Sequence, residues 1–445
     1  MGSSGLTRKL GYWDSVAISI GIVIGVGIFR VPADVAAYLK SPQMILLAWV
    51  LGGIISMLGV LCYSELSSCF PHTGGTYVYL RESYGKLVGF LFGWMEFTAL
   101  RAGSIAGVAY VFAAYLGNML GFDTGLQKYL AIGAVWVFTA VNILGLHYGT
   151  RIQNALSALK VLTLAGMTVL IFVSWPLEGR SFSGVFWDGS AGPVDWLKLA
   201  PALIPVLWSY GGWNESTFMA GEFTETKRDL PRALIGGIIL ITVLYLFMNA
   251  AYLYALPPQA MIGHEVIASD IFEKLLGRTG LLVISIAVLI SAGGGINSTI
   301  LTGARIPFAV ALDHRGMGWI GKVHERFQTP ARAYALNAGW TTCLILWGSF
   351  TDLLFFTGFA KWFFFTLAGT SVFVLRNRYR EISAFRMAGY PWVPAGFTLV
   401  SAVLFATTVF QAPKASLFGW MLLLLGIPVF MAIRYFSRHS AGTKA

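Results

Sequence analysis

The chain has 445 residues, of which 56% are hydrophobic and 11% are charged. A soluble domain carries about 25% charged residues, so this composition excludes an ordinary soluble protein. The net charge of +11 is dispersed over short segments without a strongly basic helix or arm, which argues against nucleic acid as a partner. The apolar residues fall into runs of roughly 20, the length that crosses a bilayer. We therefore expect an all-α polytopic protein in a lipid bilayer.

Taken in chain order, the apolar runs predict twelve transmembrane helices within a single domain spanning residues 1–445. The third and eighth are longer than a bilayer requires, so we expect them to tilt. The segment 263–278 is amphipathic and predicts a surface helix. The expected spans are 14–38, 43–69, 86–118, 127–146, 152–175, 199–221, 231–256, 280–311, 332–349, 353–375, 392–411 and 416–436.

The loop charges predict an orientation. With the N-terminus inside, 20 Lys and Arg residues fall on the inner side and seven on the outer side. Inner loops carry the excess of basic residues in membrane proteins. We therefore expect a multi-pass protein of the cell membrane with both termini cytoplasmic.

The first span is interrupted by Gly25-Val26-Gly27. A broken helix in a membrane survives only where it is buried in protein or lines a wet cavity. The second half-helix would begin near Val26–Ile28, and its free amides and positive dipole end suit a carboxylate. Close helix packing through a small-residue face is the alternative.

The sixth span carries a second break, in Trp208-Ser209-Tyr210-Gly211-Gly212. Its first half-helix would end near Trp208–Gly211, where free carbonyls suit an ammonium group. Paired breaks in corresponding spans indicate a transporter binding site, and these two together match a zwitterionic amino acid. Trp208 could close over the ligand as a gate, or serve as an interface anchor. Tyr210, Asn214 and Glu215 are the polar groups expected to face the cavity.

Several ionisable and amide side chains fall inside apolar spans, where they need partners. Lys160 could take the place of a bound cation, tie the fifth span to carbonyls of the first, or titrate. Glu96 and Arg101 are five positions apart, a spacing that stacks poorly on an α-helix, so we expect each to have a partner on another helix. Lys361 has no partner that the sequence identifies. Supporting roles as hydrogen-bonding contacts between helices are expected for Asn142 and Asn297.

Enzyme motifs are absent from the sequence. There is no phosphate-binding Gly-Lys-Ser/Thr loop, no His-Glu-x-x-His and no Gly-x-Ser-x-Gly. The three cysteines, Cys62, Cys69 and Cys343, have no metal-ligand spacing and read as apolar filler. We expect a transporter that is not an enzyme and that uses no cofactor or metal.

Motifs between Lys9 and Arg434 resemble the amino acid–polyamine–organocation superfamily, and within it the L-type amino acid transporter (LAT) group and its bacterial relatives. Each motif alone is weak, but their order and placement on the spans are specific. They are Ile24-Gly25-Val26-Gly27-Ile28-Phe29 with Pro32, Trp94-Met95-Glu96 with Arg101, Gln153 with Lys160, Trp208 to Asn214 followed by Asp229 to Ala233, and Asn297 to Arg305.

The resemblance implies a LeuT-like fold with discontinuous helices 1 and 6. It implies inverted repeats over 14–175 and 199–375, followed by two additional helices over 392–436. It implies that amides of Val26 and Gly27 hold the substrate carboxylate, that carbonyls near Val23, Trp208 and Gly211 hold the amine, and that Trp208 gates the site. Lys160 would occupy the sodium site of sodium-coupled relatives. The implied substrate-binding residues are Val23, Gly25, Val26, Gly27, Ile28, Trp208, Ser209, Tyr210, Gly211 and Asn214.

Three features depart from the family pattern. Val26 stands where many relatives have Ser or Gly, and Arg30 stands where a small or aliphatic residue is usual. The segment Gly121–Lys128 lacks the cysteine that links animal members to a heavy subunit, so we expect no disulfide-linked partner. The leading hypothesis is a sodium-independent exchanger of small to medium neutral L-amino acids. The alternative is a proton-coupled permease for cationic amino acids or polyamines.

Overall fold

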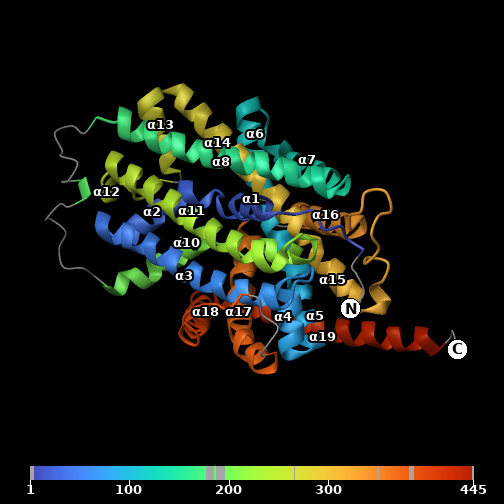
Figure 1. Cartoon of the computed structure of the whole chain (residues 1–445). Coiled ribbons are helices and arrows are strands. Elements are labelled where there is room, and N and C mark those ends of the chain that lie inside the picture. The colour runs from blue at the N-terminus through green and yellow to red at the C-terminus, as the bar shows by residue number, and fades with distance from the viewer. Residues whose placement is uncertain are drawn as a thin grey trace.

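The computed structural model of the chain describes residues 5–176, 185–186, 196–264, 266–347, 350–379 and 385–442. These residues form helices joined by short turns, and none of them belongs to a β-strand. A single isolated parallel bridge pairs Leu10 with Phe223. The helices pack side by side, and both ends of the chain lie at the same end of the bundle (Figure 1).

The first half of the chain contains two irregular helical stretches. The first predicted span is broken between α1 and α2, which are bent relative to each other. The third predicted span is interrupted by a π-helix, η1. The elements are α1 (Tyr12–Val23), α2 (Gly27–Tyr38), α3 (Pro42–Cys69), α4 (Thr76–Tyr84), α5 (Lys86–Met95), η1 (Glu96–Arg101), α6 (Ala102–Leu120), α7 (Gln127–Ile143) and α8 (Leu146–Ser174).

The second half of the chain contains a 3-10 helix, η4, after the first part of the sixth predicted span. The elements are α10 (Leu199–Ser209), η4 (Glu215–Glu222), α11 (Thr226–Ala255), α12 (Pro258–Met261), α13 (Ile267–Leu276), α14 (Arg278–Gly303), α15 (Arg305–Asp313), α16 (Ala331–Trp347), α17 (Phe350–Arg378), α18 (Trp392–Gln411) and α19 (Pro413–Gly442).

A helix lies on each of the twelve predicted ranges, and α13 lies on the predicted amphipathic segment. Within the described residues, eight helices are long and apolar enough to cross a membrane, or nine if the bent pair α1 and α2 is one span. The protein is therefore a polytopic helical membrane protein, while twelve crossings and the inverted repeat remain predictions. Helix α4 was not expected from the sequence, because its nine residues are not apolar overall.

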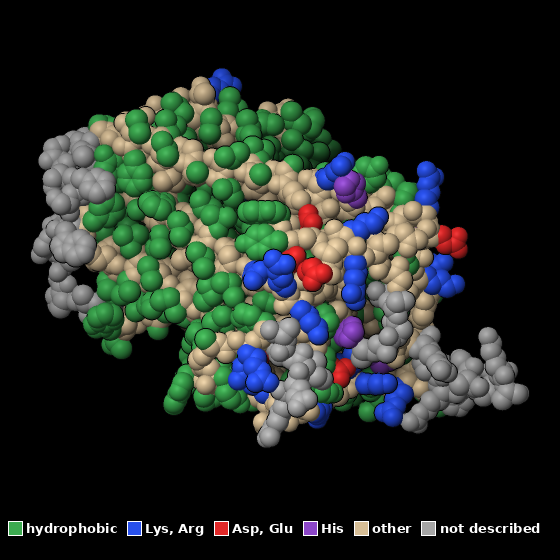
Figure 2. Space-filling model, in the orientation of Figure 1, with side chains coloured by type: hydrophobic (Ala, Val, Ile, Leu, Met, Phe, Trp, Pro, Cys, Tyr) green, Lys and Arg blue, Asp and Glu red, His purple; other side chains and the backbone are tan. Residues whose placement is uncertain are grey.

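Apolar and basic side chains are separated on the surface. In Figure 2 hydrophobic side chains cover the left and centre of the visible face, whereas Lys and Arg side chains gather toward the end that carries the two termini. A broad apolar surface is what a bilayer requires of the lipid-facing part of a protein. The end rich in Lys and Arg is the end that the sequence predicts to face the cytoplasm.

Glycines of α3 let two neighbouring helices, α10 and α11, approach it closely. A methyl group added to Gly52 of α3 would lie 2.4 Å from Val206 Cγ1 of α10, and one added to Gly53 would lie 2.6 Å from Thr242 Cγ2 of α11. Close approach at small residues favours helix association where water provides no hydrophobic driving force. Helices α10 and α11 are therefore held tightly against α3.

A buried ion pair joins elements at the end of the bundle that holds the termini. Glu222 accepts from Arg305 through both oxygens, at 2.8 and 2.7 Å. The carbonyl of Glu222 also accepts from the amides of Lys9 and Leu10, at 2.9 and 3.0 Å. The side chains of Arg305 and Glu222 are 0% and 1% exposed. These contacts tie the segment before α1 to η4 and to the junction of α14 and α15.

Candidate functional site

The two helix breaks predicted from the sequence lie against each other. Helix α1 ends at Val23 and α2 begins at Gly27, with a bend of 49° between them. A methyl group on Gly27 would lie 2.7 Å from Ser209 Oγ at the end of α10, and one on Gly212 would lie 2.2 Å from Ile22 Cγ2. Gly212 has φ +110°, a conformation that favours glycine. The glycines thus allow both the break in the second helix and its contact with the first.

The start of α2 presents amides without protein partners. Among the described residues, none accepts a hydrogen bond from the amides of Val26, Gly27 or Ile28. The next amide, that of Phe29, donates to Val26 O at 3.1 Å. The three amides and the positive end of the helix dipole can therefore bind an anionic group.

The Lys160 ammonium lies at the end of α1, where the first break leaves backbone carbonyls free. Its ammonium, on α8, donates to Gly21 O at 2.6 Å and to Ile24 O at 2.8 Å. Ser291 Oγ of α14 donates to Ile24 O at 3.0 Å. Lys160 is 2% exposed. The tie between the fifth predicted span and carbonyls of the first, which the sequence left as one of three possibilities, is therefore present.

Further polar contacts hold α8 and α14 to α1. Ser157 Oγ donates to Ala17 O at 2.6 Å, and Gln153 Nε2 donates to the same carbonyl at 3.3 Å. Asn297 Nδ2 donates to Gln153 Oε1 at 2.9 Å, while Asn142 Nδ2 donates to Asn297 Oδ1 at 2.8 Å. Asn142 and Asn297 therefore act as hydrogen-bonding contacts between helices, as expected.

The carbonyls predicted to hold an amine are partly occupied by the protein. Tyr245 Oη donates to Val23 O at 2.7 Å and to Ser209 O at 3.2 Å, so this hydroxyl joins the two breaks. Trp208 O accepts from the Gly211 amide at 3.0 Å. The Gly211 carbonyl accepts no hydrogen bond from any described residue. It is therefore open to a ligand.

The polar and aromatic residues of the second break have different surroundings. The Trp208 side chain is 52% exposed, whereas Tyr210 is 0% exposed and its hydroxyl donates to Trp49 O at 3.0 Å. Asn214 is buried, and its carbonyl accepts from Thr217 Oγ1 at 2.6 Å. The Trp208 ring is thus half-exposed beside the break, while Tyr210 is held within the bundle.

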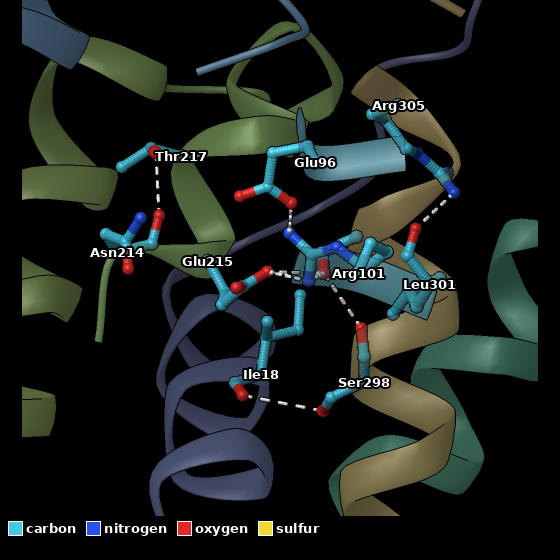
Figure 3. Close-up of polar contacts among 10 residues, drawn as sticks. Ile18, Glu96, Arg101, Asn214, Glu215, Thr217, Ser298, Leu301 and Arg305 are labelled. Atoms are coloured by element: carbon cyan, nitrogen blue, oxygen red, sulfur yellow. Dashed lines mark hydrogen bonds and ion pairs between the residues drawn. The ribbon is translucent and has the colours of Figure 1, made fainter. Parts of the chain in front are cut away.

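A cluster of charged side chains borders the second break (Figure 3). Arg101 Nη1 lies 2.7 Å from Glu215 Oε2, and its Nη2 lies 3.1 Å from Glu96 Oε2. Thr302 Oγ1 donates to the same Glu215 oxygen at 2.7 Å. The Arg101 guanidinium also lies over the Phe218 ring, 5.3 Å from its centroid.

The expectation that Glu96 and Arg101 would not pair with each other was wrong. Residues Glu96–Arg101 form a π-helix, in which hydrogen bonds link residues five apart. This geometry stacks positions i and i+5 and brings the two side chains together. Arg101 also has the expected partner on another element, Glu215 of η4.

The sequence identifies no partner for Lys361, and the structure places this side chain beside the second break. A methyl group on Gly211 would lie 2.4 Å from the Lys361 Nζ atom. The signal in the sequence was a lysine within an apolar run, which marks a functional position but not its neighbours.

Comparison with known proteins identifies the family of the chain. Residues 10–433 match the family model described as amino acid permease. The chain is 29% identical over 440 residues to the serine/threonine exchanger SteT of Bacillus subtilis (strain 168), covering 97% of this chain and 98% of the relative. It is 28% identical to the human Asc-type amino acid transporter 1, covering 96% and 82%. It is 29% identical to the mouse large neutral amino acids transporter small subunit 2, covering 96% and 81%.

The match to the family model covers nearly the whole chain, including both breaks and the charged cluster. The relatives are transporters by name, and none is an enzyme. The chain therefore belongs to the amino acid permease family of membrane transporters, within the amino acid–polyamine–organocation superfamily.

Proposed function

We propose that this protein is a sodium-independent exchanger of small to medium neutral L-amino acids. The observation that carries the proposal is the contact between two helix breaks of complementary polarity. The amides of Val26, Gly27 and Ile28 have no partner among the described residues, and the Gly211 carbonyl of the opposite break is likewise open. A carboxylate on the first and an ammonium on the second would place a zwitterion across the contact.

Lys160 supports the sodium-independent part of the proposal. Its ammonium binds two carbonyls of the first break, where a coordinated cation would otherwise supply the positive charge. A covalently attached cation cannot be released during transport. The protein then has no need of sodium to complete the site.

Exchange is supported by similarity, since one relative is named a serine/threonine exchanger and others are named transporters of neutral amino acids. In the proposed cycle Trp208 closes over the bound substrate, and the helices around the two breaks expose the site to each side in turn. The LeuT-like repeats, the cell membrane, the cytoplasmic termini and independence from a disulfide-linked heavy subunit are parts of the same proposal.

Counterflow in proteoliposomes tests the proposal. Vesicles are loaded with one unlabelled amino acid at a time, and uptake of a labelled neutral amino acid is followed without sodium. The proposal requires uptake that depends on a loaded neutral amino acid and is unchanged by added sodium. Uptake into empty vesicles driven by an inward proton gradient, with a cationic amino acid as substrate, would instead support the proton-coupled alternative.

A further inference from the structure

Helix α2, the second half of the broken first span, has one accessible side, and that side is charged. From Gly27 to Ala36 the exposed residues are Arg30 and Asp34, and every other residue of this stretch is buried. Residues four positions apart lie one turn from each other on the same side of a helix. Charged side chains within a membrane span face the protein interior or a water-filled cavity. The accessible side of α2 therefore faces water and not lipid.

The position of Arg30 along α2 strengthens this conclusion. Arg30 lies three residues, or about 4.5 Å, beyond Gly27 at the break, whereas α2 continues for about 12 Å more to its end at Tyr38. The bond from Cα to Cβ in a helix tilts toward the N-terminus of the helix. The Arg30 side chain therefore starts toward the break, away from the distant end of α2. Asp34 has the same tilt and a shorter side chain, so both charges need water at this depth.

The two charged groups have no partner within the protein. Among the described residues, none forms a hydrogen bond with either side chain, and no ion pair within 4.0 Å includes Arg30 or Asp34. The charge of Arg30 acts on the Asp34 carboxylate from beyond that distance. A free guanidinium offers five N–H donors, and a free carboxylate offers two acceptor oxygens. The pair therefore presents a positive and a negative group side by side to the water.

The accessible side of the first span leads to the paired breaks. Ile22 and Val26, eight and four positions before Arg30, are half-buried, and a methyl group on Gly212 would lie 2.2 Å from Ile22 Cγ2. Helix α10 packs against α2, and its Trp208 ring is 52% exposed. Helix α2 runs from the break toward the end of the bundle that lies away from the termini (Figure 1). Water therefore reaches Arg30 from the end that the sequence predicts to lie outside.

The order of the two charges matches the site to which they lead. Arg30 is nearer to the break, whose open amides suit a carboxylate, and Asp34 is one turn farther from it. Residues four apart on a helix have Cβ atoms about 5–6 Å apart. The two charges of an α-amino acid are about 2.5 Å apart, a distance set by ordinary bond lengths. One such molecule can therefore lie between the two side chains with its carboxylate toward the break.

We propose that Arg30 and Asp34 form an entry site for zwitterionic amino acids, in a water-filled passage that leads to the paired breaks. The Arg30 guanidinium binds the carboxylate, and the Asp34 carboxylate binds the ammonium. A molecule held in this way already has its carboxylate directed toward the amides of Val26–Ile28 when it moves on to the breaks. The inference rests on the proposed function, because the entry site supplies the substrate of the paired breaks.

Thiol labelling tests whether the passage exists. Cys62, Cys69 and Cys343 are replaced by alanine, and Arg30→Cys and Leu162→Cys are made separately in that background. Reconstituted protein is treated with a sulfonated methanethiosulfonate reagent, which needs water to reach the thiol, and the mass of the protein is followed. Leu162 of α8 is the control on the apolar surface, because its side chain is 68% exposed. Arg30→Cys should react, an excess of alanine should slow the reaction, and Leu162→Cys should stay unmodified.

Transport kinetics test the docking role. Counterflow of alanine is measured in Arg30→Gln, Asp34→Asn and the control Arg278→Gln. Arg278 is an exposed basic residue directly after α13, which packs against α2. Two unit charges 4 Å apart in water attract enough for about a fivefold change in affinity. Arg30→Gln and Asp34→Asn should each raise KM by about fivefold and keep the maximal rate. Arg278→Gln should match the wild type.

Three results would overturn the inference. The first is an Arg30→Cys protein that does not react, because water then does not reach this position. The second is labelling that alanine does not slow, and the third is a lower maximal rate with an unchanged KM in Arg30→Gln. In each case wild-type counterflow leaves the proposed exchange intact. Absence of wild-type counterflow with every amino acid refutes the exchange itself, and the two failures are distinguishable because labelling requires no transport.

Discussion

Replacing Lys160 by methionine should remove the support of the first break while keeping a side chain of similar length. In an unbroken helix Gly21 O would accept from the amide of Gly25, but that amide donates to Val23 O at 2.8 Å. The Gly21 carbonyl therefore depends on Lys160, whereas Ile24 O keeps a second donor. One buried acceptor left without a partner costs about 2 kcal/mol, or roughly a 30-fold shift in the equilibrium that maintains the break.

The assay is the rate of counterflow per mole of reconstituted protein, with thermal stability measured on the same preparation. Lys160→Met should lower the rate by more than about tenfold. Ser291→Ala is the graded control, because it removes a neutral donor from Ile24 O and leaves Lys160 on both carbonyls. It should weaken the break by about 1 kcal/mol or less.

Wild-type exchange in Lys160→Met, with unchanged thermal stability, would refute the reasoning. It would mean that the two carbonyls find other partners and that the ammonium is dispensable. A rise in the wild-type rate on addition of sodium would refute the idea that Lys160 stands in for a cation, even if the variant is impaired.

Three further predictions concern other parts of the site and its support. Trp208→Ala should reduce exchange far more than it reduces the yield of folded protein, because the half-exposed ring is proposed to act on the substrate; unchanged exchange removes Trp208 from the mechanism. Glu222→Gln should lower stability by about 3–5 kcal/mol, because it leaves the buried Arg305 guanidinium without its carboxylate; in a thermal-shift measurement the exposed Glu225→Gln should match the wild type. Gly212→Ala should abolish exchange and lower stability, since its methyl group would lie 2.2 Å from an α1 side chain at a φ of +110°; full activity would show that the break can relax.

The features best predicted from the sequence are those that depend only on residues close together along the chain. Glycine pairs locate the two breaks, and the expected limits agree with the start of α2 at Gly27 and the end of α10 at Ser209. Apolar runs located a helix on each predicted range because length and hydropathy are properties of a continuous segment. The contact of Lys160 with the first break is one of the arrangements that the sequence predicts, since a lone lysine in an apolar helix needs acceptors.

Contacts between distant segments could not be read in the same way. The position of Lys361 beside Gly211 depends on how α17 packs against the second break, which no local pattern specifies. The pairing of Glu96 with Arg101 does not follow from the sequence, because a spacing of five stacks poorly on an α-helix and a π-helix has no clear signature in residue type. Twelve crossings and the inverted repeat likewise concern relationships between segments and remain predictions.

The π-helix η1 also changes how the helix on either side of it is oriented. It acts as one extra residue inserted into an α-helix, and each residue turns an α-helix by about 100°. The faces of α5 and α6 are therefore out of phase by about that angle, although the chain runs through them without a turn. A helical wheel drawn over α5, η1 and α6 as one α-helix would therefore place the residues of either α5 or α6 on the wrong face. Deleting one residue of η1, so that α5 continues into α6 as a regular α-helix, should therefore separate Arg101 from Glu96 or from Glu215.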